Sequence, residues 1–214
     1  MSFLMACSLS GCAKKQEASV KEEVSEEVQE ETVSIKENKI LVVYFSRAGE
    51  QYEVGVIKEG NTAIVAKMIC EGSNADRFEV KPVDDRYDLS YNDLTDVAKR
   101  EQNDSARPDY LEDGMPDLST YDVIFIGAPV WWGDWPMIMY SFFESNADAL
   151  DGKTLVPFST HAGSGLSGFD KKLASVFKKS QILKGLAVSG EKAQNDREGT
   201  KTKVTAWLDE LNLK

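Results

Sequence analysis

The sequence has few side chains of the kinds that bind metals, with three cysteines and one histidine among 214 residues. No two cysteines form a Cys-x-x-Cys pair, so the chain cannot build a closed zinc site. No apolar run is long enough to span a bilayer. Basic residues are outnumbered, with 25 Lys and Arg against 36 Asp and Glu and a net charge of −11. This balance argues against nucleic acid as a partner, because the chain would displace few counterions from phosphates.

The N-terminal part differs from the rest of the chain. Residues 1–11 are short and apolar, and Leu9-Ser10-Gly11 precedes Cys12 and two lysines. This pattern resembles the lipobox of bacterial lipoproteins, in which Cys12 would carry the lipid. Residues 12–38 contain eight Glu and two Lys between positions 17 and 37, which is typical of a solvated, disordered tether. We therefore expect a signal segment, a tether and one domain over residues 39–214. The lipid alone would hold this domain to the membrane, on its extracytoplasmic face, and a chain without the lipid would be cytoplasmic.

From residue 39 onward, apolar runs of β-forming residues alternate with helical patterns. The strand runs are 39–46, 77–82, 121–129, 153–160 and 182–189, and the helical patterns are 61–72, 137–146, 169–180 and 193–213. A polar segment with one helical pattern at 91–102 occupies residues 84–120. This order predicts an α/β fold with a doubly wound, five-stranded parallel sheet in three α/β/α layers. We expect Gly72 to end the first helix, and Cys70 and Trp207 to be buried.

Ligands bind such sheets beyond the carboxyl ends of the strands, so the loops there are informative. The loop after the first strand has Ser46 and Gly49 at its start and Asn61-Thr62 at its end. Side chains of this kind can cap a helix, and they can also cradle a phosphate. Capping explains Asn61 or Thr62 but leaves Ser46 and Gly49 unexplained, which favours a phosphate. No Walker lysine follows, so the loop does not bind a nucleoside triphosphate.

The loop after the third strand, APVWWGDWP (128–136), holds three of the four tryptophans. Trp131 and Trp132 are adjacent and cannot easily face the same way, and Gly133 leaves the backbone open to close approach. We therefore expect at least one of the two indoles to stack on a flat aromatic ligand. Trp135 fits the core and the site equally well.

The loop after the fourth strand reads THAGSGLSG (160–168) and satisfies the pattern Gly-x-Gly-x-x-Gly. It is not in the first βα unit, and no acidic residue follows at the required distance, so dinucleotide binding has weak support. These glycines are expected to let backbone N–H groups reach the edge of a ring. His161 is either a site residue or an ordinary surface or core histidine. The absence of a Gly-x-Ser-x-Gly pattern leaves a hydrolase with little support.

The three loops together, with the strings VVYFSRAGE, GNT, PVWWGDWP and THAGSGLSG, resemble the flavodoxins over about Lys39 to Leu213. The resemblance implies FMN as the cofactor and no catalytic side chain. It places around the phosphate Ser46, Arg47, Ala48, Asn61, Thr62 and Ala63. It places along one side of the isoalloxazine Pro129, Trp131, Trp132 and Gly133. It places near the other edge of the ring Thr160, His161, Gly163, Ser164 and Gly165. An insertion at 50–59 splits the phosphate loop, and Arg47 would contact the phosphate or lie over the ring.

Two functions follow from the resemblance. The first is a low-potential electron carrier whose acidic rim docks redox partner proteins with basic surfaces. The alternative is an FMN-dependent NAD(P)H:quinone or nitro-compound oxidoreductase on the same fold. A third hypothesis is a surface protein that has lost its cofactor, and the intact loops argue against this hypothesis.

Overall fold

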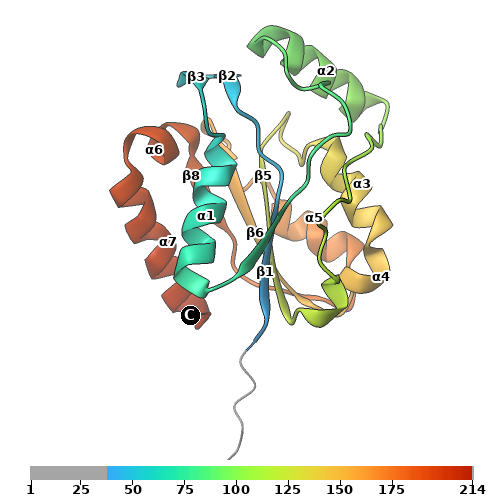
Figure 1. Cartoon of the computed structure of the whole chain (residues 1–214), viewed down its shortest axis with the longest axis vertical. Helices are drawn as coiled ribbons and strands as arrows, with labels where there is room; N and C mark the ends of the chain where they lie inside the picture. Colours follow the sequence, from blue (N-terminus) through green and yellow to red (C-terminus); the bar gives the residue numbers. More distant parts are fainter. Residues whose placement is uncertain (1–37, 214) are drawn as a thin grey trace, which may run out of the picture. The chain divides into compact units, whose positions relative to one another are not determined.

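The structure is a computed structural model, and it describes residues 38–213 (Figure 1). The expected signal segment, the acidic tether and the lipid site at Cys12 lie outside these residues. Among the helices of this part of the chain, none is both long and apolar enough to traverse a lipid bilayer.

A parallel sheet forms the centre of the fold, as the sequence predicts. Its strands are β1 (Ile40–Tyr44), β4 (Asp76–Glu79), β5 (Val123–Pro129), β6 (Thr154–His161), β7 (Gln181–Ile182) and β8 (Leu186–Ser189). They run in the order β4-β1-β5-β6, and β7 and β8 both pair with the outer side of β6. All five residues of β1 are buried, which is typical of a strand covered on both faces. The order is that of a flavodoxin-like sheet, so the predicted fold class is confirmed.

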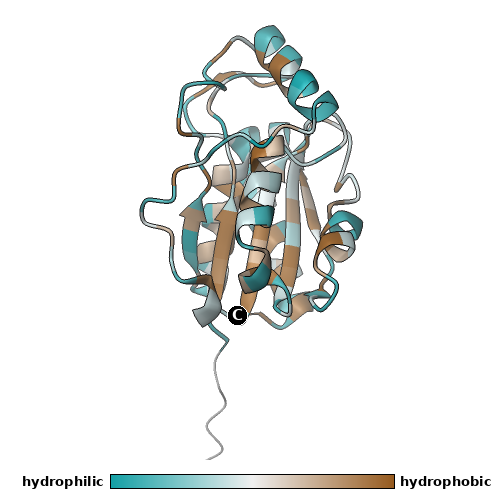
Figure 2. Cartoon of the chain, turned by 90° about the vertical axis from the view of Figure 1, so that its right-hand side faces the viewer, coloured by the Kyte–Doolittle hydropathy of each residue, from teal (hydrophilic) through white to brown (hydrophobic). Residues whose placement is uncertain are grey.

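Helices cover both faces of this sheet. On one face lie α1 (Asn61–Ser73), α6 (Gly190–Asn195) and α7 (Arg197–Leu211), and on the other lie α3 (Met137–Ser145), α4 (Ala147–Leu150) and α5 (Phe169–Val176) (Figure 1). Alternate residues of β1 enter two separate cores: Val42 packs with the first helix group, and Val43 with the second. In Figure 2 the strands are largely hydrophobic while the helices carry hydrophilic stretches.

Two elements outside these layers, a hairpin in the insertion and the helix of residues 91–103, lie at the end of the sheet toward which β1 runs (Figure 1). The insertion forms an antiparallel hairpin of β2 (Gly49–Gln51) and β3 (Gly55–Ile57). The polar segment 84–120 contains α2 (Tyr91–Asn103) and a short 3-10 helix, η1 (Leu118–Thr120). Ser90 caps α2 by accepting the N–H of Asp93. The helical pattern predicted at 91–102 is therefore confirmed.

The last strand is broken where the sequence predicts one continuous run. β7 pairs with Thr154 and Leu155, and β8 pairs with β6 again only from Phe158. The gap coincides with Pro157, which has no N–H to donate to a neighbouring strand. A Cβ on Gly185 would lie 2.8 Å from the carbonyl oxygen of Pro157, so the connecting chain passes too close for a side chain.

Helix ends also differ from the sequence prediction. The single helix expected at 193–213 is divided into α6 and α7, because the Asp196 side chain accepts the N–H of Gly199 and starts a new helix. The first helix continues past Gly72 and ends at Asn74, which adopts a left-handed conformation with φ 50°. Gly72 instead permits close packing, since a Cβ there would lie 2.6 Å from Leu208 Cδ1 on α7. α5 ends at Val176, four residues before the predicted end.

Two single-residue predictions concern burial. Trp207 is in the core as predicted, and its indole N–H donates to the carbonyl of Lys184 at 2.8 Å. Cys70 is half-buried rather than fully buried. Burial nevertheless raises the pKa of its thiol to about 11, so Cys70 remains a neutral thiol at physiological pH.

We expect replacement of Gly127 with alanine to destabilise the fold by about 1–3 kcal/mol, the usual cost of overpacking a core. Gly127 lies in β5 opposite Phe158 of β6, and a Cβ there would lie 2.0 Å from Phe158 Cζ. Chemical denaturation measures the effect. The double variant G127A/F158L should recover part of the loss, because the smaller side chain relieves the collision. An unchanged free energy of unfolding in G127A would contradict this packing.

Candidate functional site

The carboxyl ends of β1, β5, β6 and β8 meet at a cleft of about 440 Å³. This volume is within the range of small-molecule and cofactor sites. The strand-end loops contribute Asn61, Pro129, Val130, Trp131, Trp132, Thr160, His161, Ala162, Gly190 and Glu191. The cleft therefore lies where ligands bind in open α/β sheets. It brings together six of the predicted site residues: Asn61, Pro129, Trp131, Trp132, Thr160 and His161.

The two ends of the loop between β1 and α1 remain in contact despite the insertion between them. Ser46 Oγ accepts the N–H of Ala63 at 3.0 Å, so it satisfies one of the free donors of the first turn. Gly60 precedes α1, and a Cβ there would lie 2.2 Å from Ser46 Oγ and 2.5 Å from the carbonyl oxygen of Arg47. Within residues 38–213, the backbone N–H groups of Asn61 and Thr62 have no hydrogen-bond acceptor. These two donors at the start of a 13-residue helix are suited to an anion.

Asn61 is held at the edge of the cleft by the start of α6. Its Oδ1 accepts a hydrogen bond from Gln194 Nε2 at 2.8 Å. A Cβ on Gly190 would lie 2.4 Å from Asn61 Nδ2, so Gly190 is needed for this close approach. The structure thus fixes the Asn61 side chain against α6, which follows it in the sequence by more than a hundred residues.

The Arg47 side chain points away from this cleft. Its guanidinium donates to the carbonyl of Tyr87 at 2.7 Å and also to the carbonyls of Glu50 and Leu89. Burial lowers the pKa of Arg47. Ser46, Arg47 and Ala48 line a second hollow of about 380 Å³. The structure therefore uses Arg47 to tie the hairpin to residues 87–89, and Arg47 is not among the residues that line the cleft.

Trp131 and Trp132 both line the cleft but are supported differently. The Trp131 ring is half-buried and packs edge-on against Phe45 and Tyr87, with ring centroids 5.3 Å and 5.1 Å away. Trp132 is 53% exposed, and its Nε1 donates to the carbonyl of Thr95 on α2 at 3.0 Å. Lys99 Nζ lies 5.0 Å from the Trp132 ring centroid, and this cation–π contact further fixes the ring.

Gly133 forms a tight turn and does not line the cleft. Trp131 and Asp134 exchange two backbone hydrogen bonds of 3.0 Å and 2.9 Å, with Trp132 and Gly133 between them. These two residues have φ values of 50° and 75°, as a type I′ turn requires. Glycine thus makes the turn that presents Trp132.

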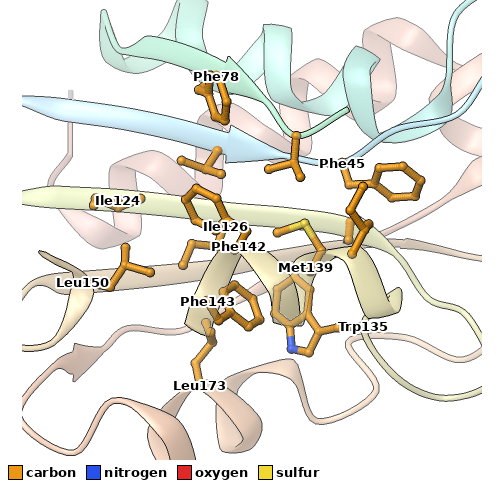
Figure 3. Close-up of a cluster of buried hydrophobic side chains, with 14 of the residues drawn as sticks. Phe45, Phe78, Ile124, Ile126, Trp135, Met139, Phe142, Phe143, Leu150 and Leu173 are labelled. Carbon is orange, nitrogen blue, oxygen red and sulfur yellow. The ribbon is translucent and has the colours of Figure 1, made fainter. Parts of the chain in front are cut away.

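Trp135 belongs to the core, which resolves the two alternatives left by the sequence. It is 1% exposed and stacks on Phe169 with a centroid distance of 3.5 Å. Figure 3 shows its indole among Met139, Phe143 and Leu173.

The loop after β6 contributes Thr160 and His161 to the cleft. His161 Nδ1 accepts the N–H of Gly163 at 3.0 Å, and burial and then the charge of Lys203 lower its pKa. The imidazole is therefore largely neutral at pH 7. Gly163, Ser164 and Gly165 lie beyond the cleft lining, and the carbonyl of Gly165 accepts the hydroxyl of Ser159.

Thr62 and Thr160 share a buried hydrogen bond of 2.7 Å between their hydroxyl oxygens. Thr62 is 1% exposed, and its hydroxyl is directed to the sheet by this bond to Thr160 of β6. We expect Thr62→Val to destabilise the protein by about 1–3 kcal/mol, because it leaves the Thr160 hydroxyl unpaired. The double variant T62V/T160V should be closer to wild type in chemical denaturation. A double variant that loses as much as both single variants together would show that the two hydroxyls act independently.

Sequence reasoning missed the part of the cleft that comes from the hairpin and α2. These residues are Gln51, Tyr52, Glu53, Tyr91, Leu94, Thr95 and Ala98. The signal available in the sequence was two tyrosines, Tyr52 and Tyr91, in otherwise polar segments. Glu191, in the first turn of α6, was also missed.

The fold and the site define an α/β protein that binds a ligand at the carboxyl edge of a doubly wound sheet. A family model described as flavodoxin matches residues 39–211, so the chain belongs to the flavodoxin family. No curated protein matches the chain.

Solved structures are similar to this chain. A proposed flavoprotein of Bacteroides eggerthii is 29% identical, with a TM-score of 0.63 over 83% of this chain and 99% of that one. A proposed flavoprotein of Bacteroides uniformis is also 29% identical, with a TM-score of 0.61 over 81% and 99%. A Lactobacillus acidophilus flavoprotein, solved in complex with FMN, is 21% identical, with a TM-score of 0.54 over 75% and 99%.

Proposed function

We propose that this protein binds FMN in the cleft and acts in electron transfer as a low-potential carrier. Family membership and the FMN complex of the Lactobacillus acidophilus protein support FMN as the cofactor. The observation that carries the proposal is that Trp131, Trp132 and Asn61 line one cleft at the strand ends. Indole faces suit a flat ring, and free N–H groups at a helix start suit a phosphate.

The residues present fit this cofactor. Gly60 and Gly190 leave no room for a Cβ, so the backbone at both positions is held close to its neighbours beside the cleft. The N–H groups of Asn61 and Thr62 would hold the phosphate, and Trp131 and Trp132 would orient the ring. The neutral His161 would offer a hydrogen bond at the ring edge. When bound, FMN supplies the electron-transfer chemistry, and the chain binds, orients and shields it.

The charge of the cleft supports a low potential. The charged side chains that line it are Glu53 and Glu191, both exposed. Negative charge beside a flavin disfavours the electron-rich, anionic reduced form. A redox titration of the loaded protein should therefore give a potential below that of free FMN for the second electron. Equal potentials for bound and free FMN would contradict the proposed carrier.

The test of FMN binding uses the purified full chain. It should contain FMN, or take it up, in a one-to-one ratio, seen as flavin absorbance and as quenched flavin fluorescence. Trp132→Ala should weaken binding about threefold to tenfold, because an aromatic contact contributes about 0.5–1.5 kcal/mol. A matched control is Val176→Ala, at an exposed position outside the cleft. A chain that takes up no flavin would contradict the proposal.

One observation favours a second candidate, an FMN-dependent oxidoreductase that reduces a small molecule directly. The hairpin and α2 add walls to the cleft, whereas a carrier requires an open flavin edge for a partner protein. Adding NADPH and a quinone to the loaded protein distinguishes the two. Turnover without a separate reductase favours the oxidoreductase, and reduction only through a redox partner protein favours the carrier.

Docking and location are also proposed from the sequence. The acidic net charge suits redox partners with basic surfaces, and such docking should weaken as salt is raised. A lipid at Cys12 would hold the domain on the extracytoplasmic face of the membrane. Mass spectrometry of the chain from its own cells tests this, and an unmodified Cys12 would contradict it.

A further inference from the structure

Among residues 38–213, Glu101 is the only charged residue that is buried. It lies in the last turn of α2 and shares the buried face of that helix with Leu94 and Ala98. A buried carboxylate is unfavourable unless charges and hydrogen bonds compensate for its lost hydration. An apolar side chain at this position would extend the buried face without that cost, so the carboxyl group indicates a role other than packing.

Two partners compensate for the burial of this carboxyl group. The Tyr87 hydroxyl donates to Glu101 Oε2 at 2.9 Å, and Arg86 Nη1 lies 3.5 Å from Oε1. Arg86 is itself fixed, because its Nε and Nη2 donate to the two carboxylate oxygens of Asp84 at 2.7 Å and 2.9 Å. Burial raises the pKa of Glu101, against the opposing effects of the hydrogen bond from Tyr87 and the charge of Arg86. Burial and then the charge of Glu101 raise the pKa of the Tyr87 hydroxyl, which therefore stays protonated as the donor.

Tyr87 is fixed at its main chain as well as at its hydroxyl, and this sets the direction of its ring. Its carbonyl accepts a hydrogen bond from Arg47 Nε at 2.7 Å, and the residue is buried. The ring packs edge-on against Trp131 and Phe45, with centroid distances of 5.1 Å and 5.5 Å. Trp131 and Phe45 also pack edge-on against each other at 5.3 Å. Each of the three rings therefore contacts the other two, so a turn of the Tyr87 ring displaces its neighbours.

Trp131 is the ring of the three that lines the cleft. Glu101, Arg86 and Tyr87 are not among the residues that line it, so they can act on a ligand there only through Trp131. Without Glu101 the Tyr87 hydroxyl would be a buried donor without a partner. Such a donor is unfavourable, so the ring would turn toward water or another acceptor and move away from its present contact with Trp131.

We propose that Glu101 is a positioning residue, which holds the Tyr87 ring by its hydroxyl and thereby sets the orientation of Trp131 in the cleft. The effect on FMN rests on the proposed function, because it takes Trp131 to orient the flavin ring. The effect on Trp131 itself does not require flavin and can be measured in the chain without it.

The test is fluorine NMR of the full chain labelled with fluorotryptophan, which reports the surroundings of each indole. The Trp131 signal is the one missing from Trp131→Phe. Glu101→Leu should shift or broaden this signal, while the signals of Trp135 and Trp207 stay in place. Glu101→Gln should leave the Trp131 signal unchanged, since an amide oxygen can accept the same hydrogen bond.

A residue that only stabilised the fold would change the free energy of unfolding and leave the Trp131 signal in place. An unshifted signal in E101L would therefore overturn the proposal. A shift in E101Q as large as that in E101L would also overturn it, because the hydrogen bond would then not be what holds the ring.

Tyr87→Phe tests the same connection from the other partner, and it provides the answer if E101L does not fold. It removes only the hydroxyl oxygen, so it should shift the Trp131 signal while the protein stays folded. The double variant E101L/Y87F leaves neither partner unpaired, and E101L should add no shift to that of Y87F. A double variant that shows the sum of the two shifts would overturn the proposal, since Glu101 would then act on Trp131 by another route.

FMN titration of the same variants measures the consequence for the cofactor. E101L and Y87F should each weaken FMN binding about twofold to tenfold, the range expected for an aromatic contact, and E101Q should bind like wild type. Asp96→Leu is the matched control, since Asp96 is an exposed acid on the same helix and does not line the cleft. Wild-type affinity in a chain whose Trp131 signal has shifted would overturn the effect on FMN. A wild-type chain that takes up no FMN would contradict the proposed function instead, and the fluorine signals would still decide the role of Glu101.

Discussion

Replacing Gly60 with alanine should lower FMN affinity by about tenfold to a hundredfold, because overpacking costs about 1–3 kcal/mol. Gly60 has φ −65° and ψ 148°, a conformation that alanine adopts freely, so the loss does not come from backbone strain. It comes from collision: the new Cβ would lie 2.2 Å from Ser46 Oγ and 2.5 Å from the carbonyl oxygen of Arg47. The loop must open, and the N–H groups of Asn61 and Thr62 would then move relative to the cleft.

A titration of FMN fluorescence measures this affinity, and a double variant shows which atom causes the collision. Ser46→Ala removes the hydroxyl that Gly60 faces, and it also removes the cap on Ala63, which contributes about 0.5–2 kcal/mol. The double variant G60A/S46A should bind FMN better than G60A but below wild type, because the Arg47 carbonyl still collides. Unchanged affinity and stability in G60A would mean that residues 46–47 and 60 do not pack as described.

The sheet and the position of the cleft could be predicted from the sequence because both depend on local patterns. Buried strands such as β1 and β5 are continuous apolar runs, and the strand-end rule then places Asn61, Trp131 and Thr160 together. The ends of elements could not be predicted so well, because distant residues decide them. In the sequence Gly72 is typical of a helix end. In the structure its missing Cβ makes room for the side chain of Leu208, more than a hundred residues later.

The remaining part of the site was unpredictable for a similar reason. Arg47 lies beside the phosphate loop in sequence, yet its acceptors are main-chain carbonyls, two of which are at Tyr87 and Leu89, some forty residues away. Carbonyl groups leave no signature in a sequence. Tyr52 and Tyr91 lie in polar segments, and no periodicity shows that these segments fold against each other over the sheet. The wall of the cleft that they form depends on tertiary contacts alone.

Replacing Trp135 with alanine should destabilise the protein by about 3–5 kcal/mol, the usual cost of emptying a large aromatic site in a core. The residue is 1% exposed, stacks on Phe169 at 3.5 Å and packs edge-on against Phe143 at 5.4 Å. Its indole N–H has no hydrogen-bond partner in the structure that spans residues 38–213, which is itself unfavourable. Trp135→Phe should therefore stay within about 1 kcal/mol of wild type, since a smaller ring leaves a small cavity but removes an unpaired donor.

The same pair of variants distinguishes the core tryptophan from the cleft tryptophans. W135F should bind FMN like wild type, because Trp135 does not line the cleft. Trp132→Ala provides the matched comparison three residues earlier: its half-exposed ring should contribute less to the free energy of unfolding than the buried ring of Trp135, but its removal should weaken FMN binding. Thermal or chemical unfolding and FMN titration of the three variants give the two readouts. A W135F chain that folds like wild type yet loses FMN would place this indole in the site, and would mean that all three tryptophans of the 128–136 loop serve the ligand.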